Sequence, residues 1–306
     1  MTHAGPAPSA PDFRCASASL LRDEPVGGTA STVRAFLLLE HPGPWGIDAL
    51  RDARLPDGLG ARLRAASAET GVRVLLVRRS GARPSNDGPW ILAAHADPHR
   101  PRLEAGRVSD LTEALDLDLA GLRAGRPSGL PAYDGSVLCV CTHGRHDACC
   151  AERGRPVARA LAQAHPEETW EVSHIGGDRF AGNLLVLPHG LYYGRLEPPS
   201  ALAVAGSHLT GHLDLDHLRG RSGHPMPVQY AEIALRRELA ETRLDALTLT
   251  ARTTGDGVTE AVFDVAGASY AVRVRTTRGP DVQRLTCRAG RDNPVPRHDL
   301  LGIHRR

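Results

Sequence analysis

Short apolar runs and helical stretches alternate in this chain, and the same order of elements occurs twice. Within the first copy, buried strands and one helix are predicted at 33–41, 58–71 (the helix), 72–79 and 89–96. Within the second copy they are predicted at 136–141, 149–166 (the helix), 169–174, 183–187 and 191–196. Strands alternating with helices predict an α/β fold, here with two units of similar pattern.

Composition shifts along the chain divide it into four predicted segments. Residues 1–30 are rich in Pro, Ala, Ser and Gly and are predicted to be a flexible lead. An α/β unit over 31–130 and a second over 131–245 meet near a Gly/Pro-rich linker. Alternating apolar residues over 246–306 predict a β extension, with a hairpin around Gly267.

Charge and hydropathy exclude several classes of protein. The formal net charge of +2 over 306 residues gives no reason to expect nucleic acid or an acidic membrane surface as a partner. The first residues lack the basic start and apolar run of a secretory signal, and no apolar run is long enough to span a membrane. We therefore expect a cytoplasmic protein, in which clustered cysteines are more often metal ligands or reactive thiols than disulfides.

Four of the six cysteines lie between positions 139 and 150. Cys141 falls at the end of a predicted strand, whereas Cys139 lies two residues earlier and is expected to be buried core. Asp147 is a plausible N-cap, which would place Cys149 and Cys150 in the first turn of a helix. Adjacent residues point in different directions, so one metal ion is not expected to bind both.

Two histidines lie within the loop after Cys141, and a third follows the next predicted strand. We interpret His143 and His146 as exposed loop residues. His174 ends a strand, and Asp178 follows after a Gly-Gly pair that favours a tight turn. Alone, this spacing indicates a β-turn; its combination with the Cys-x8-Cys loop of Cys141 and Cys150 favours a metal site.

The stretches CTHGRHDACCAERGRPVARAL, WEVSHIGGDRFAGNLLVLPHGLYYGRL and DHLRGRSG resemble the sucrase/ferredoxin-like family, in the version common in actinobacteria. The resemblance implies a thioredoxin-like fold that holds a [2Fe–2S] cluster and transfers electrons to a redox partner protein. The resemblance further implies that fungal relatives hold the cluster with two cysteines and the two histidines of an H-x-x-x-H motif. Cys141, Cys150 and His174 match three of these ligands, whereas Asp178 replaces the second histidine. Asp178 or Cys149 would then be the fourth ligand.

Three other functions remain open for the same residues. Cys141, Cys150 and His174 also suit zinc, which accepts a carboxylate as fourth ligand. A thiol redox enzyme is disfavoured because the chain has no C-x-x-C motif. A metal-free interaction module on the same fold is the third alternative. We expect an electron carrier rather than a catalyst, because no carboxylate pair is set as in a glycosidase.

Overall fold

The computed structural model describes residues 13–81 and 87–306 of the chain. The first copy of the pattern contains β1 (Ala35–Glu40), α2 (Ala49–Asp52), α3 (Leu59–Thr70), β2 (Arg73–Arg78), β3 (Trp90–His95), β4 (Arg102–Arg107), the 3-10 helix η1 (Leu111–Leu115) and α4 (Leu119–Arg123). The second contains β5 (Val137–Cys141), α5 (Ala148–Ala164), β6 (Thr169–Val172), the 3-10 helix η2 (Asp178–Phe180), β7 (Leu184–Leu187), β8 (Leu191–Tyr193), α6 (Pro198–Leu209), β9 (Leu218–Arg221) and α7 (Met226–Glu238).

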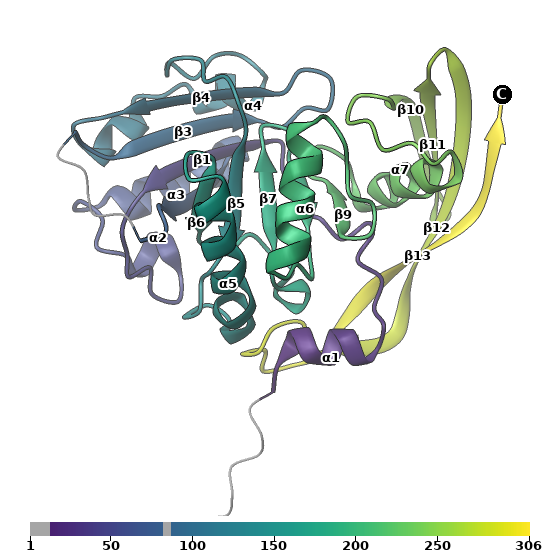
Figure 1. Ribbon diagram of the computed structural model, residues 1–306, viewed down its shortest axis with the longest axis horizontal. Helices are drawn as coiled ribbons and strands as arrows, with labels where there is room; N and C mark the ends of the chain where they lie inside the picture. The colour runs from purple at the N-terminus through teal and green to yellow at the C-terminus, as the bar shows by residue number, and fades with distance from the viewer. Residues whose placement is uncertain (1–12, 82–86) are drawn as a thin grey trace, which may run out of the picture.

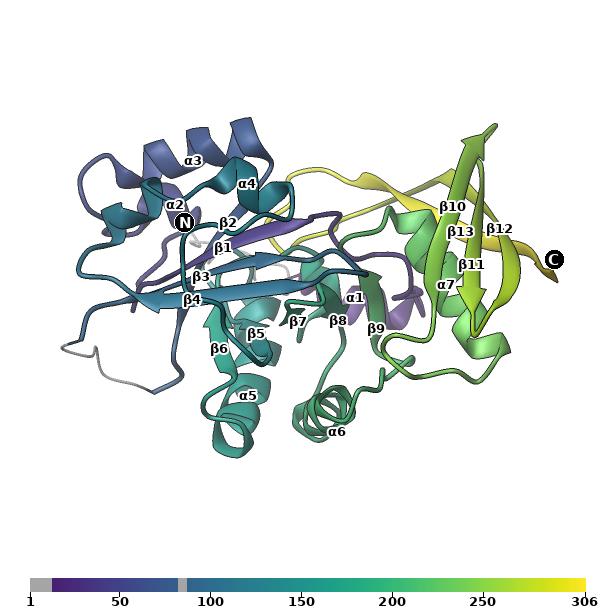
Figure 2. The same cartoon turned by 90° about the horizontal axis from the view of Figure 1, so that it is seen from above.

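Both copies contribute to one nine-stranded sheet of order β4-β3-β1-β2-β6-β5-β7-β8-β9 (Figures 1 and 2). In each copy the first two strands are parallel neighbours, and the third lies antiparallel on the other side of the first. The copies meet where β2 pairs antiparallel with β6. The mixed α/β class is confirmed, and the two similar strand patterns share one sheet.

The curled sheet has helices outside it and side chains of both copies inside it. Leu37 of β1 packs in one cluster with Leu63 of α3, and Leu138 of β5 packs in another with Leu161 of α5. A third cluster joins Phe36 and Leu38 of β1 to cysteines and aromatic residues of the second copy. Because both faces of these strands are buried, they appear in the sequence as continuous apolar runs rather than as alternation.

The last part of the chain forms a separate antiparallel sheet of four strands in the order β10-β11-β12-β13. Its strands are β10 (Thr248–Gly255), β11 (Val258–Val265), β12 (Ala268–Gln283) and β13 (Asn293–Arg305). Helix α7 packs against it, and the predicted hairpin at Gly267 joins β11 to β12. Strands β12 and β13 form a long ribbon that reaches down to the N-terminal helix α1 (Cys15–Leu21) (Figure 1).

Helix α1 (Cys15–Leu21) differs from the prediction of a flexible lead over residues 1–30. It buries Cys15 and Ala16 in a small cluster with Cys149. The Pro- and Ser-rich composition of this region hid a short helix that tertiary contacts stabilise; residues 1–12 of the predicted lead lie outside the described residues. Among the described residues, no helix has the length and apolar character needed to cross a membrane.

Candidate metal centre

The first part of the site is built where β5 ends and α5 begins. The Asp147 side chain accepts the Cys149 N–H at 2.9 Å and caps α5, as the sequence predicted. Helix α5 continues through Pro156 to Ala164. A Cβ at Gly154 would lie only 2.1 Å from the Cys141 carbonyl oxygen, so glycine at this position lets α5 cross directly over the end of β5.

This close crossing brings together the thiols of Cys141 and Cys150. Both residues are only 1% exposed, and the two thiols are close enough for each to shift the pKa of the other. The interaction with Cys150 lowers the pKa of Cys141, and the same interaction, together with burial, raises the pKa of Cys150. Of the two thiols, Cys141 therefore loses its proton at the lower pH. Cys139 is fully buried in the core, as predicted.

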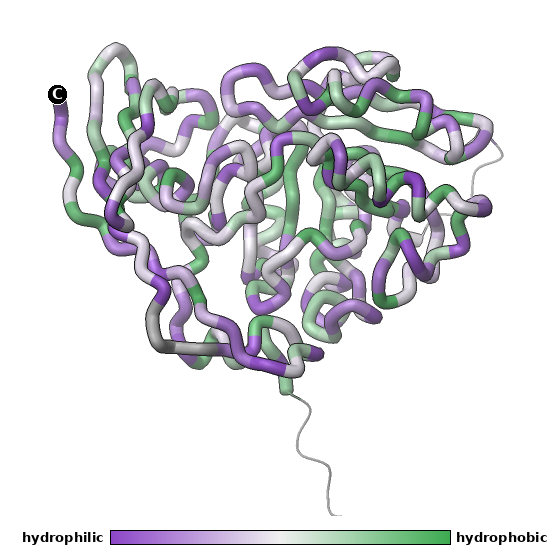
Figure 3. The backbone as a smooth tube through the Cα atoms, turned by 180° about the vertical axis from the view of Figure 1, so that it is seen from behind, coloured by the Kyte–Doolittle hydropathy of each residue, from purple (hydrophilic) through white to green (hydrophobic). Residues whose placement is uncertain are grey.

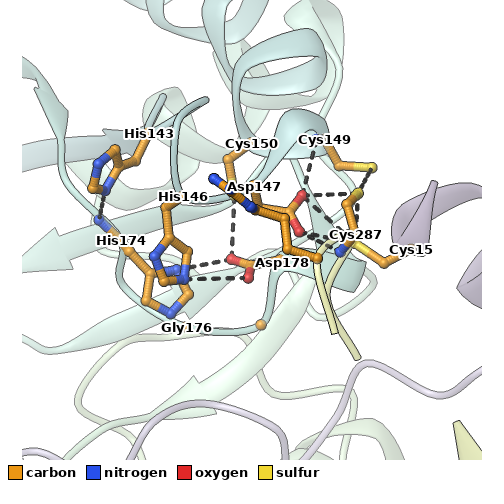
Figure 4. Close-up of polar contacts among 12 residues, drawn as sticks. Cys15, His143, His146, Asp147, Cys149, Cys150, His174, Gly176, Asp178 and Cys287 are labelled. Carbon is orange, nitrogen blue, oxygen red and sulfur yellow. Dashed lines mark hydrogen bonds and ion pairs between the residues drawn. The ribbon is translucent and has the colours of Figure 1, made fainter. Parts of the chain in front are cut away.

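His174 and Asp178 come to the same thiols from the turn after β6. The His174 Nδ1 lies 2.8 Å from Asp178 Oδ1, and Cys150 Sγ donates to the same oxygen at 3.2 Å (Figure 4). The turn requires Gly177, whose φ is +80° and whose Cβ would lie 2.2 Å from Arg219 Nη2. The structure thus brings together the four residues that the sequence proposed as ligands from this segment: Cys141, Cys150, His174 and Asp178.

Opposite charges stabilise the contact between the half-buried His174 and the buried Asp178. Burial opposes both charges, but the contact with Asp178 raises the pKa of His174, and the contact with His174 lowers the pKa of Asp178. His174 Nδ1 and Asp178 Oδ2 are both buried atoms, and Oδ2 has no hydrogen-bond partner among the described residues. An imidazole nitrogen and a carboxylate beside two thiols are a donor set suited to a metal.

The histidines of the loop are not the exposed residues that we expected. His143 is 3% exposed, its Nδ1 accepts the His174 N–H at 3.2 Å, and its Nε2 lies 2.9 Å from the Gly46 carbonyl oxygen. His146 stacks on His174 with ring centroids 3.8 Å apart, and its Nε2 lies 3.8 Å from Asp178 Oδ2. The prediction is wrong for His143, because the segment at Gly46 covers a loop that looks solvated in sequence.

His146 adds a fifth donor that the sequence interpretation missed. Its Nδ1 lies 3.1 Å from the Ile47 carbonyl oxygen, which leaves Nε2 facing the site. Donor atoms of His146, His174 and Asp178 all lie within 4.8 Å of one another. A histidine whose second nitrogen contacts a backbone carbonyl is a common arrangement for a metal ligand.

Arg219 is a second residue that sequence reasoning missed, although it lies in the DHLRGRSG stretch. Its guanidinium is buried and donates to the Gly176 carbonyl oxygen at 3.0 Å and to Asn183 Oδ1 at 2.8 Å. Burial lowers the pKa of Arg219 to about 10, so it stays charged at neutral pH. The hydrogen bond to Gly176 stabilises the backbone of the turn between His174 and Asp178.

Cys149 points away from this group and into another one. Its Sγ lies 3.4 Å from the Sγ of Cys287, beside Cys15 and Asp147 (Figure 4). A hydrogen bond from Cys15 lowers the pKa of Cys149 to about 6. The adjacent cysteines therefore face different groups, as strand and helix geometry led us to expect for neighbouring residues.

A surface pocket of about 420 Å³ opens beside the histidine side of the centre. Its lining includes His143, His146 and His174 together with Arg51 and Arg73. The cysteine side is closed by the core, so the histidines form the side of the centre nearest to solvent.

A model of the sucrase/ferredoxin-like family matches residues 27–220, which include Cys141, Cys150, His174 and Asp178. No curated protein and no solved structure matches the chain. The match spans more than half of the 306 residues and leaves out Cys15 and Cys287. With the motif residues gathered in one buried centre, this match shows that the chain belongs to the sucrase/ferredoxin-like family.

Proposed function

We propose that this protein is a one-electron carrier that holds a [2Fe–2S] cluster with Cys141, Cys150, His174 and Asp178. The observation that carries the proposal is the contact of the buried Cys150 thiol with Asp178 Oδ1 at 3.2 Å, the oxygen that also lies 2.8 Å from His174 Nδ1. The buried Cys141 thiol interacts with all three of these residues. Two thiolates paired with non-thiolate donors are known in [2Fe–2S] centres, where histidines replace two cysteines on one iron. Membership of the family supports the same cofactor.

The strand order supports the thioredoxin-like part of this proposal. In both copies the first two strands are parallel and are joined by a crossover helix. The antiparallel third strand lies beside the first, and the fourth lies beside the third. This order, fourth-third-first-second, is that of a thioredoxin-like fold. The candidate ligands lie at the carboxyl ends of the parallel pair β5 and β6, where α/β folds commonly bind their ligands.

The residues of this chain would have three separate tasks in electron transfer. When bound, the cluster supplies a site that accepts and releases one electron. Cys141 and Cys150 bind through thiolates and exclude water, because both are almost completely buried. Arg219 contributes positive charge beneath the centre, and its interaction with Asp178 and Cys141 favours their anionic forms. The pocket beside His146 and His174 is where we expect a redox partner protein to approach.

A single zinc ion is the second candidate for the same residues. Its supporting observation is the short spacing of the donors, with Cys150 Sγ and Asp178 Oδ1 only 3.2 Å apart. Zinc binds sulfur, nitrogen and oxygen donors in a closed tetrahedral site. Such an ion would stabilise the fold and carry no electron.

Metal content and colour distinguish the two candidates. The full chain, expressed with iron supplied and purified without oxygen, is expected to be coloured and to contain about two irons per chain, as one [2Fe–2S] centre requires. Reduction by one electron should give an EPR signal that the oxidised protein lacks. A colourless protein with zinc bound to Cys141 and Cys150 and no iron would refute the electron-carrier proposal.

The fourth ligand is tested with variants of Asp178 and His146. If Asp178 binds iron, Asp178→His is expected to retain the cluster and to add a second histidine nitrogen in pulsed EPR. Replacing a carboxylate with a neutral imidazole should also raise the midpoint potential, by at least about 59 mV, one tenfold step for one electron.

His146→Gln is the matched control for this variant, because Gln keeps a polar side chain on the same loop. It should leave the iron content and the single nitrogen signal unchanged. Loss of the nitrogen signal or of iron in His146→Gln, with no change in Asp178→His, would assign the fourth position to His146.

A further inference from the structure

We propose that the chain has a second metal site, in which Cys15, Cys149, Cys287 and a carboxylate oxygen of Asp147 bind one zinc ion. This site is separate from the centre described above and does not depend on the electron-carrier function. Its ligands come from α1, from the first turn of α5 and from the connection between β12 and β13. The four donor atoms all lie within 4.8 Å of one another (Figure 4).

The spacing of these atoms suits one tetrahedral ion. With Zn–S bonds of about 2.3 Å and a Zn–O bond of about 2.0 Å, tetrahedral geometry sets sulfurs about 3.8 Å apart and sulfur from oxygen about 3.5 Å apart. Cys287 Sγ lies 3.4 Å from Cys149 Sγ and 3.6 Å from Cys15 Sγ. Asp147 Oδ1 lies 3.2 Å from Cys287 Sγ and 3.6 Å from Cys15 Sγ. In these four pairs an ion would need the donor atoms to move apart by only tenths of an ångström.

The surroundings hold the ligands in position before an ion arrives. The Asp147 carboxylate is buried and accepts backbone N–H groups from Cys149 at 2.9 Å and from Cys287 at 2.6 Å. These bonds fix the carboxylate in the way that outer hydrogen bonds orient metal ligands. Cys149 lies at the N-terminus of the 17-residue helix α5, where the helix dipole favours a thiolate.

The site also accounts for how two outlying segments are attached to the body of the protein. The part of the β12–β13 ribbon that descends to α1 is mostly hydrophilic to neutral (Figure 3), and Cys287 packs there against a small cluster that includes Cys15 and Cys149. Helix α1 has only seven residues, too few to be stable alone. A zinc ion would tie both segments to α5. As zinc binds, each coordinating thiol forms a Zn–S bond and releases its proton to solvent, and no electron is transferred.

Cobalt and zinc binding test the proposal in a background without the first site. The full-length Cys141→Ser/Cys150→Ser chain, purified without oxygen and freed of metal, is titrated with Co²⁺ and then with Zn²⁺. We expect about one equivalent of Co²⁺, with the intense visible bands of tetrahedral thiolate coordination, and its displacement by one Zn²⁺. Adding Cys287→Ser to this background should weaken Zn²⁺ binding at least tenfold, whereas adding Cys139→Ala should not.

Proteolysis tests the same site in the background chain itself, without a further substitution that could prevent folding. Removing zinc from the otherwise unaltered background chain should speed cleavage within 284–292, and restoring zinc should reverse the effect. Metal binding unaffected by Cys287→Ser would overturn the proposal. So would a Cys149–Cys287 disulfide, found by peptide mapping of freshly isolated, metal-free chain. Because the first site is absent in this background, either failure leaves the electron-carrier proposal untouched.

Discussion

Cys141→Ser and Cys150→Ser should each remove the visible colour and lower the iron content from about two per chain to near zero. Each thiol is 1% exposed, and the two converge at the crossing of α5 and β5. Serine has almost the same size but is a poor donor to iron in an iron–sulfur cluster. No other cysteine replaces either thiol, because Cys149 faces Cys15 and Cys287.

Cys139→Ala is the control for these variants. Cys139 lies on the same strand and is fully buried in the same core cluster, but two residues before the end of the strand. Its truncation should cost on the order of 1 kcal/mol of stability and leave the iron content unchanged. Absorption spectra and iron assays of the three variants, purified side by side, provide the comparison. A coloured Cys141→Ser protein beside a colourless Cys139→Ala protein would refute the ligand assignment.

Arg219→Met should destabilise the protein by about 3–5 kcal/mol, because it leaves buried carbonyl oxygens without donors. Arg219 donates to Gly176, to Asn183 and to the Thr29 carbonyl oxygen at 2.6 Å. Methionine fills similar space but donates no hydrogen bond. Since Gly176 lies in the turn between His174 and Asp178, iron content should fall together with stability.

Arg237→Met is the matched control, because the Arg237 side chain is 55% exposed. We expect its effect to stay below about 0.5 kcal/mol. The urea midpoint, together with the slope of the transition, measures both changes. A loss of less than 1 kcal/mol in Arg219→Met, with normal iron content, would show that the buried guanidinium does not support the turn.

Much of the first site follows from local sequence patterns. Its position at the end of the strand distinguished Cys141 from Cys139, and the N-cap rule placed Asp147 at the start of α5. Parallel strands end at one edge of a sheet, so the ends of β5 and β6 bring His174 to Cys141 without any knowledge of distant contacts. Each of these predictions depends on residues close in sequence.

What the sequence did not predict depends on contacts between distant segments. The pairing of β2 with β6 merges two units into one sheet, and no local pattern specifies it. His143 is buried because its Nε2 lies against the Gly46 carbonyl oxygen, which is 97 residues away. Cys15 and Cys287 looked isolated because 272 residues separate them. The two cysteines lie next to each other only when α1 and the β12–β13 ribbon are both packed against the body of the protein.

The position of Cys287 has a consequence for the order of events during translation. The ligands proposed for the first site, with their support at Thr29 and Arg219, all precede the β12–β13 ribbon in the chain. A nascent chain can therefore assemble that part while Cys15, made first, still waits for a partner 272 residues later. The protein would then take up its two metals in sequence, iron before zinc. Ribosome-bound chains arrested on either side of residue 287 should differ in bound zinc and agree in bound iron.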